Sequence, residues 1–145
     1  SNGKMQNRKD LASIIADHDV PYVGQTTMIG NFSDLHKKAE KAIYTEGAAF
    51  LNIMTPCPRG WRYDTADIMK ICKLAVETCY WPMFEVEHGK WRLTYEPKKK
   101  LPIEDFLREQ GRFKHLFKPG NEDLIAQFQA EVDRRWEELQ YKCAR

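Results

Sequence analysis

The sequence has no long hydrophobic run, and this absence excludes a membrane-spanning helix. A helix that crosses a bilayer needs roughly 18 consecutive apolar residues, and no stretch of the 145 residues approaches that length. The first residues, Ser1 to Lys4, also lack the apolar core of a signal peptide. We therefore predict a soluble, cytoplasmic protein that does not bind membranes.

An excess of charge of one sign is also missing. The 23 Lys and Arg residues nearly balance the 21 Asp and Glu residues, which leaves a formal net charge of +2. A dedicated nucleic-acid-binding protein carries a clear excess of basic residues. The balance of charge therefore argues against a nucleic-acid partner.

Several motifs that define self-contained sites are absent. The four cysteines form no Cys-x-x-Cys pair and are too sparse for a disulfide scaffold, which favours a reducing compartment. There is no Gly-x-Gly-x-x-Gly, Walker or Gly-x-Ser-x-Gly motif, and so no visible nucleotide site or hydrolase triad. The four histidines are not spaced as metal ligands would be. We expect them to be surface or capping residues: His18, His36, His88 and His115.

The sequence does contain enough apolar material for a folded domain. Hydrophobic residues make up 42% and aromatic residues 12% of the chain, and its length suits one domain. In the first half, segments with helical spacing alternate with short apolar runs. This alternation predicts an α/β fold with a parallel sheet and flanking helices.

The first half predicts two helix–strand pairs. The first helix is indicated by the spacing of Leu11, Ile14, Ile15 and His18, and a strand follows at residues 20–24. Ser33 is placed to cap a second helix and Gly47 to end it. The apolar face of that helix carries Leu35, Ala39, Ala42 and Ile43. Residues 48–54 form an unbroken apolar run, which is typical of a strand covered on both faces.

The second half predicts a loop, a helix, a hairpin and a helical arm. Two prolines and a glycine argue against helix or strand in residues 55–61. Asp64 then caps a helix whose apolar face carries Ile68, Ile71, Cys72, Ala75, Val76 and Cys79. Residues 84–87 and 91–95 alternate around a turn with glycine, which predicts a β-hairpin.

The composition shifts after the hairpin. Residues 97–100 form a charged linker, and Pro102 opens a short helix that ends at Gly111. Asn121 caps a last helix with Ile125, Phe128, Val132, Trp136 and Leu139 on its inner face. We interpret this tail as an arm that docks on another surface.

Among the cysteines, Cys57 is the candidate for chemistry. It lies in a Pro-Cys-Pro turn directly after a buried strand, at the carboxyl end where parallel sheets place ligands. Such a thiol has the fixed geometry of a metal or cluster ligand, although turn formation alone also explains the prolines. Cys72 and Cys79 lie on an apolar helix face and are expected as inert core thiols, and Cys143 has no expected function.

At this loop the sequence resembles a known family, the beta subunits of 2-oxoacid:ferredoxin oxidoreductases, most closely the pyruvate type. The most specific match is Thr55-Pro56-Cys57-Pro58-Arg59-Gly60-Trp61-Arg62-Tyr63-Asp64, followed by Leu74-Ala75-Val76-Glu77-Thr78 and Trp81-Pro82. Further matches are Arg8-Lys9-Asp10-Leu11, Pro21-Tyr22-Val23, Phe50-Leu51-Asn52-Ile53, Glu87-His88-Gly89-Lys90-Trp91 and Gln110-Gly111-Arg112-Phe113-Lys114-His115-Leu116.

The resemblance implies an enzyme that uses thiamine diphosphate and Mg²⁺ to decarboxylate a 2-oxo acid. The acyl group passes to coenzyme A, and electrons pass through [4Fe-4S] clusters to ferredoxin. The other implied partners are the remaining subunits of the oxidoreductase. Cys57 matches the fourth cysteine ligand of the cluster in the beta subunit. A thiolate is the ligand that an iron–sulfur centre requires, and a neighbouring proline cannot donate a backbone hydrogen bond to the sulfur.

The departures from the family predict a partial chain. The family's Gly-Asp-Gly motif and upstream Cys-x-x-Cys are missing, and we expect both to precede Lys4. Residues 4–82 then form the carboxyl-terminal half of a thiamine diphosphate-binding domain, and residues 83–145 a hairpin with a helical extension. Such a chain by itself is expected to be inactive and to bind neither thiamine diphosphate nor a cluster.

Other interpretations of the sequence stay open. The chain could be a standalone protein-interaction module without catalysis, or Cys57 could be a redox-sensing thiol. Lys98, Lys99 and Lys100 could attract an acidic ferredoxin, or form an ordinary solvated linker. Pyruvate is the preferred substrate, and branched-chain 2-oxo acids are the alternative.

Overall fold

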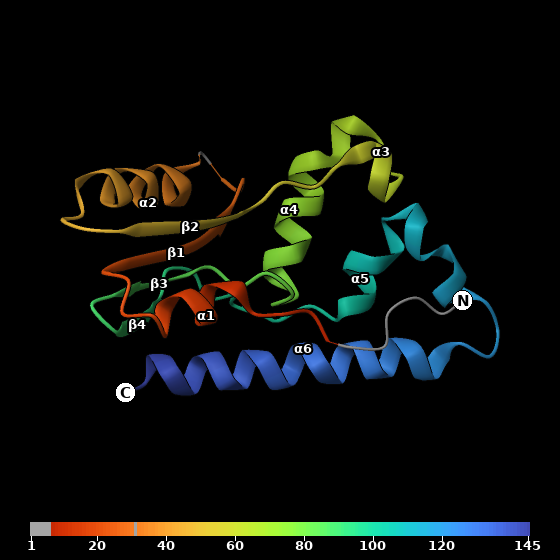
Figure 1. Cartoon of the computed structure of the whole chain (residues 1–145). Coiled ribbons are helices and arrows are strands. Elements are labelled where there is room, and N and C mark those ends of the chain that lie inside the picture. Colours follow the sequence, from red (N-terminus) through yellow and green to blue (C-terminus); the bar gives the residue numbers. More distant parts are fainter. Residues whose placement is uncertain (1–6, 31) are drawn as a thin grey trace.

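The chain forms a mixed four-stranded sheet flanked by helices, in a computed structural model that describes residues 7–30 and 32–145 (Figure 1). The first seven elements are α1 (Leu11–Ala16), β1 (Tyr22–Thr27), α2 (Ser33–Tyr44), β2 (Ala49–Met54), α3 (Pro58–Trp61), the 3-10 helix η1 (Thr65–Asp67) and α4 (Ile68–Glu77). They are followed by β3 (Phe84–Glu87), β4 (Lys90–Leu93), α5 (Ile103–Arg108), the 3-10 helix η2 (Gly111–Phe117) and α6 (Glu122–Cys143).

The strand order is β2-β1-β3-β4, and it confirms the α/β class. Strands β1 and β2 pair in parallel, as expected for strands joined through a helix. The hairpin β3–β4 does not stand apart from this sheet, because β3 pairs with β1 in the antiparallel direction. The sheet is therefore mixed rather than wholly parallel, since the second edge of β1 forms its hydrogen bonds with the hairpin.

Strand β2 corrects one prediction. The apolar run was expected to be covered on both faces, but one face of β2, which lies at the edge of the sheet, is partly exposed. Ala49 is exposed, and Ile53 keeps 40% of its surface accessible. Within residues 7–30 and 32–145, no further strand pairs with its outer edge. An apolar edge strand of this kind is normally covered or paired.

The two helices near the start of the sheet also expose residues that were predicted to be buried. Leu11 and Ile14 of α1 are 47% and 44% exposed, whereas Ala12 is fully buried. On α2, Ile43 is 77% exposed, and the buried residue is instead Lys38. The spacing identified the helices correctly, but it did not identify which side packs on the sheet.

The ends of α2 differ from the prediction as well. Ser33 is the first helical residue rather than the cap, and Phe32 precedes it in the left-handed conformation without a side-chain capping bond. The helix ends at Tyr44 with Thr45 as its carboxyl-terminal cap. Gly47 lies beyond the helix, in a bend where its φ of +102° suits glycine.

Helix α4 is confirmed as the most regular amphipathic segment. Asp64 accepts a hydrogen bond from the backbone N–H of Ala66 and so caps η1, which leads directly into α4. The apolar face of α4 is buried, as predicted, at Ile71, Cys72, Ala75 and Val76. Cys72 and Cys79 are therefore core thiols, as expected.

The carboxyl-terminal arm docks on its own chain. Figure 1 shows α6 running along the side of the molecule, past α5 and toward the hairpin. Val132, Trp136 and Leu139 are buried there, and the expected inward residues Ile125 and Phe128 are partly buried. The division into residues 4–82 and 83–145 stays a prediction, and residues 4–6 lie outside the described part of the chain. None of the helices in that part is both long and apolar enough to cross a membrane.

A polar layer lies between α2 and the sheet. The Lys38 ammonium, 1% exposed, donates to the backbone carbonyl of Gln25 at 2.8 Å and to Asp34 and Thr94 at 2.7 Å each. Beside it, the buried carboxylate of Glu85 accepts hydrogen bonds from Tyr22, Lys41 and Arg92. Buried charges are tolerated only when they are paired and hydrogen-bonded in this way.

The lowered pKa values of two carboxylates, Asp34 and Glu131, predict that the fold loses stability in acid. Burial by itself raises the pKa of Asp34, but the hydrogen bonds from Lys38 and Thr26 and the charge of Lys38 together outweigh it and lower the pKa. Hydrogen bonds from Arg134 lower the pKa of Glu131 to about 2. Each group therefore stabilises the fold above its unfolded pKa of about 4 and loses this effect as the pH falls through its folded pKa.

We expect the thermal unfolding midpoint to decrease steadily as the pH is lowered from about 5 to about 2. Circular dichroism melts at several pH values would measure this decrease. A Glu131→Gln variant should show a smaller decrease than the unmodified chain, because its side chain cannot titrate. Equal acid sensitivity of the two proteins would contradict the assignment to Glu131.

Candidate functional site

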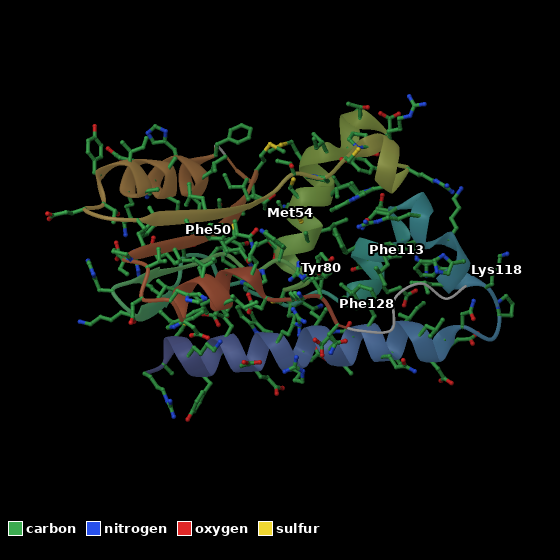
Figure 2. All side chains as sticks on the ribbon, in the orientation of Figure 1. Phe50, Met54, Tyr80, Phe113, Lys118 and Phe128 are labelled. Atoms are coloured by element: carbon green, nitrogen blue, oxygen red, sulfur yellow. The ribbon has the colours of Figure 1, made fainter. Side chains whose placement is uncertain are left out.

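The candidate site lies beyond the carboxyl ends of β1 and β2, where parallel strands of α/β proteins present ligands. Figure 2 shows Met54 at this end of β2, toward α3 and α4. The hydroxyl of Thr27, at the end of β1, donates to the backbone carbonyl of Met54 at 2.7 Å. This bond joins the two strand ends immediately before the loop that carries Cys57.

The loop itself corrects the prediction that residues 55–61 contain no helix. Pro58 to Trp61 form the single turn of α3, with Cys57 at its N-cap. Proline is tolerated there because the first helical residue needs no backbone N–H donor. The N–H of Trp61 donates to the Cys57 carbonyl at 2.8 Å, and the N–H of Gly60 donates to the Cys57 Sγ at 3.4 Å.

Further contacts fix the loop from its two sides. The Tyr63 hydroxyl donates to the carbonyl of Pro56 at 3.1 Å. The N–H of Gly111, far along the chain, donates to the carbonyl of Arg62 at 3.0 Å. The turn that carries Cys57 is therefore held by hydrogen bonds from Tyr63, just after it, and from Gly111 of η2.

A cation and an aromatic ring pack against Trp61 in the same turn. The Arg112 guanidinium lies 3.8 Å from the centroid of the Trp61 ring, which is a favourable cation–π distance. Phe106, which is fully buried, meets the edge of Trp61 with ring centroids 6.2 Å apart. Burial lowers the pKa of Arg112, although an arginine side chain stays charged in proteins.

Cys57 fits an iron–sulfur ligand in its exposure and its hydrogen bonding. Its thiol is exposed, whereas Cys72 and Cys79 are buried. Burial raises the pKa of the Cys79 thiol to about 11, which disfavours the thiolate. The backbone N–H of Gly60 points at the Cys57 Sγ, and hydrogen bonds to cluster sulfurs are one way in which proteins tune iron–sulfur centres.

Cys57 stands alone as a candidate ligand in the described part of the chain. Among residues 7–30 and 32–145, no group of three or more His, Cys, Asp or Glu side chains is placed to hold a metal. The histidines are all exposed, as predicted: His18, His36, His88 and His115. Of the three lysines considered either as a site that attracts ferredoxin or as a solvated linker, Lys98 and Lys99 are exposed, but Lys100 forms an ion pair with Asp133.

Sequence reasoning did not assign a function to residues 110–113 or to Thr27. The structure brings both to the Cys57 loop. Residues 110–113 contact Arg62 and Trp61, and Thr27 donates a hydrogen bond to Met54. A signal was present for the first, because Gly111 stands between polar residues where the short helix after Pro102 was expected to end, although α5 itself ends earlier, at Arg108. No local pattern indicates which distant loop that glycine contacts.

The comparisons with known proteins place the chain in a class. No family model matches it. It is 41% identical to pyruvate synthase subunit PorB of Thermotoga maritima over 94% of this chain and 42% of that protein. It is 42% identical to PorB of Methanosarcina barkeri over 92% of this chain and 45% of that protein. The chain is 39% identical to ketoisovalerate oxidoreductase subunit VorB of Pyrococcus furiosus over 92% of this chain and 42% of that protein.

The chain is thus a homologue of the beta subunits of 2-oxoacid:ferredoxin oxidoreductases, which confirms the resemblance. Within that class, its similarity to pyruvate synthase subunit PorB extends over nearly all of its residues. The chain spans less than half the length of these curated relatives.

Proposed function

We propose that the chain is part of the beta subunit of a thiamine diphosphate-dependent oxidoreductase that converts a 2-oxo acid, pyruvate in the first place, to an acyl-coenzyme A. The electrons released from the 2-oxo acid would pass through [4Fe-4S] clusters to ferredoxin. The observation that carries the proposal is the 41% and 42% identity to pyruvate synthase subunits over more than nine-tenths of the chain. VorB, at 39% identity, makes a branched-chain 2-oxo acid the alternative substrate.

Cys57 is the residue of this chain that would bind the cluster. Its thiolate would ligate one iron, while the Gly60 N–H donates to the same sulfur. Pro56 and Pro58, on either side, have no backbone N–H to offer. When bound, a cluster supplies one-electron transfer.

No residue of this chain is assigned to thiamine diphosphate or Mg²⁺, because the sequence lacks the Gly-Asp-Gly motif. Those ligands would belong to the remaining length of the complete subunit, which is more than twice as long in the relatives. The apolar outer edge of β2 supports this arrangement, since the rest of the cofactor domain would cover it. Residues 4–82 would then complete that domain, and the 145-residue chain by itself would be inactive.

Partners follow from the same proposal. The relatives are named as subunits, so the chain would associate with the other subunits of a cytoplasmic oxidoreductase. Lys98 and Lys99 remain free to attract an acidic ferredoxin, a long-range effect that would decrease with ionic strength. Coenzyme A and the 2-oxo acid would be its small-molecule substrates.

The test is reconstitution of the complete beta subunit with its partner subunits. We expect reduction of a viologen dye or ferredoxin that requires both pyruvate and coenzyme A. 3-Methyl-2-oxobutanoate in place of pyruvate tests the branched-chain alternative, and the 145-residue chain serves as the inactive control. An assembled, cofactor-loaded complex that oxidises neither acid would contradict the proposal and favour a non-catalytic interaction module.

A further inference from the structure

Residues 110–113, Gln-Gly-Arg-Phe, follow α5 and form the start of η2, with Gln110 as its N-cap and Gly111 to Phe113 as its first residues, and they pack against the Cys57 loop. We propose that this segment, the 110–113 clamp, fixes the Cys57 thiolate for the cluster, and that Arg112 is a positioning residue that acts through Trp61. The inference rests on the proposed function, because it assumes that Cys57 is a cluster ligand. Its evidence comes from three separate contacts of the clamp.

The first contact is a close backbone approach at Gly111. Its N–H donates to the carbonyl of Arg62 at 3.0 Å. A Cβ on residue 111 would lie 2.8 Å from the Arg62 Cβ and 2.9 Å from the Arg62 carbonyl oxygen. Both distances are shorter than a van der Waals contact, so a larger residue would push the clamp away from the loop.

The second contact is the Arg112 guanidinium on the Trp61 ring. The Arg112 Nε donates to Gln110 Oε1 at 2.8 Å, and the Gln110 amide donates to the carbonyl of Phe106 at 2.7 Å. Gln110 is itself 1% exposed, so the group that orients the guanidinium is held rigidly. Arg112 forms no ion pair with any carboxylate of residues 7–30 and 32–145. Its positive charge is therefore not neutralised by a partner at the loop.

The third contact anchors the clamp to the rest of the protein. Phe113 lies against Phe128 of α6 with ring centroids 6.1 Å apart, and Figure 2 labels Phe113 beside α5 and η2 and Phe128 just above α6. The clamp therefore connects the Cys57 loop to the long helix. A loop fixed at one end by β2 and at the other by this segment has little freedom to move its thiol.

Trp61 links Arg112 to Cys57, because it contacts both residues. Its N–H donates to the carbonyl of Cys57 at 2.8 Å, and the two residues stand one turn apart, about 6 Å along the helix axis. A cluster held by thiolates carries negative charge, which increases on reduction. The Arg112 cation, which lies on the Trp61 ring of the same turn, would favour the reduced form of the cluster, in addition to holding the turn in place.

The test compares three variants of the complete, reconstituted enzyme. In Arg112→Met, we expect the cluster that depends on Cys57 to show a lower reduction potential and an altered electron paramagnetic resonance signal. Arg112→Lys, which keeps the cation, should restore both toward the unmodified values. Arg108→Met is the control, because Arg108 is exposed and pairs with Glu104, and its potential should not change.

Gly111→Ala tests the positioning by a different change. We expect its cluster iron to be lost to a chelator about 10-fold faster, the order of effect for residues that orient a metal ligand. Circular dichroism would show whether each variant is folded. If folded Arg112→Met and Gly111→Ala variants keep an unchanged potential, signal and iron loss rate, the clamp is wrong and the proposed function stands. If removing Cys57 leaves all clusters in place, the assignment of Cys57 fails instead.

Discussion

Replacement of Cys57 by alanine in the complete enzyme is expected to remove one [4Fe-4S] cluster and to decrease ferredoxin reduction by more than about 100-fold. Loss of a residue that only orients a metal ligand costs about 10–100-fold in affinity or activity, so loss of the ligand itself should exceed this range. Iron content, electron paramagnetic resonance and the rate of pyruvate-dependent ferredoxin reduction would measure the effect.

The matched control is Cys143→Ala, because Cys143 lies at the end of α6, away from the strand ends that present Cys57. It should keep its full iron content and rate. A Cys57→Ala enzyme with unchanged iron would show that the exposed thiol is not a ligand. The redox-sensing alternative predicts a different result, in which Cys57→Ala keeps activity but no longer responds to oxidants.

Replacement of Lys38 by alanine is expected to destabilise the chain by about 3–5 kcal/mol. The cost arises because Asp34, 17% exposed, would keep its charge without the ammonium that lies 2.7 Å away. The Gln25 carbonyl and the Thr94 hydroxyl would also lose a hydrogen-bond partner. Urea unfolding of the 145-residue chain, followed by circular dichroism, would measure the change in the free energy of unfolding.

Lys37→Ala is the control for helix propensity and total charge, since Lys37 is exposed on the same helix. It should change the free energy of unfolding by no more than about 0.5 kcal/mol. A double variant, Lys38→Met with Asp34→Leu, removes both charges and should recover part of the loss. Equal stabilities of Lys37→Ala and Lys38→Ala would contradict the buried position of Lys38.

The polar layer and the Cys57 loop depend on the same strand. Thr26 donates to Asp34 in the layer beneath α2 at 2.6 Å, and the next residue, Thr27, holds the Met54 carbonyl before the loop. Because consecutive strand residues point to opposite faces, β1 supports α2 on one side and can contact other structure on the other. Destabilisation of α2 would therefore also loosen the strand end that positions Cys57.

The sequence by itself determined the features that depend on local spacing. The apolar period of α4 identified its buried face, including Cys72, because an α-helix brings residues three and four apart to one side. Cys79 was expected on the same helix but follows its end at Glu77, in the left-handed conformation, and is buried there. The hairpin followed from alternation around Gly89, and the parallel pairing of β1 and β2 from the helix between them. The Pro-Cys-Pro loop also indicated Cys57 as the candidate ligand, and its motif indicated the similarity to the beta subunits of 2-oxoacid:ferredoxin oxidoreductases.

Only the tertiary structure decided which surfaces are covered and which distant residues meet. A largely apolar run such as residues 49–54 suits either a central strand or an edge strand, and pairing alone made β2 the edge. Lys38 is buried because Gln25 of β1 and Thr94, just after β4, meet it beside Asp34 of its own helix. The 110–113 clamp reaches Arg62 and Trp61 across about fifty residues of chain, a contact set by packing and not by any local period. Local sequence fixes how a segment folds, whereas the contacts between segments depend on the free energy of the whole packed structure.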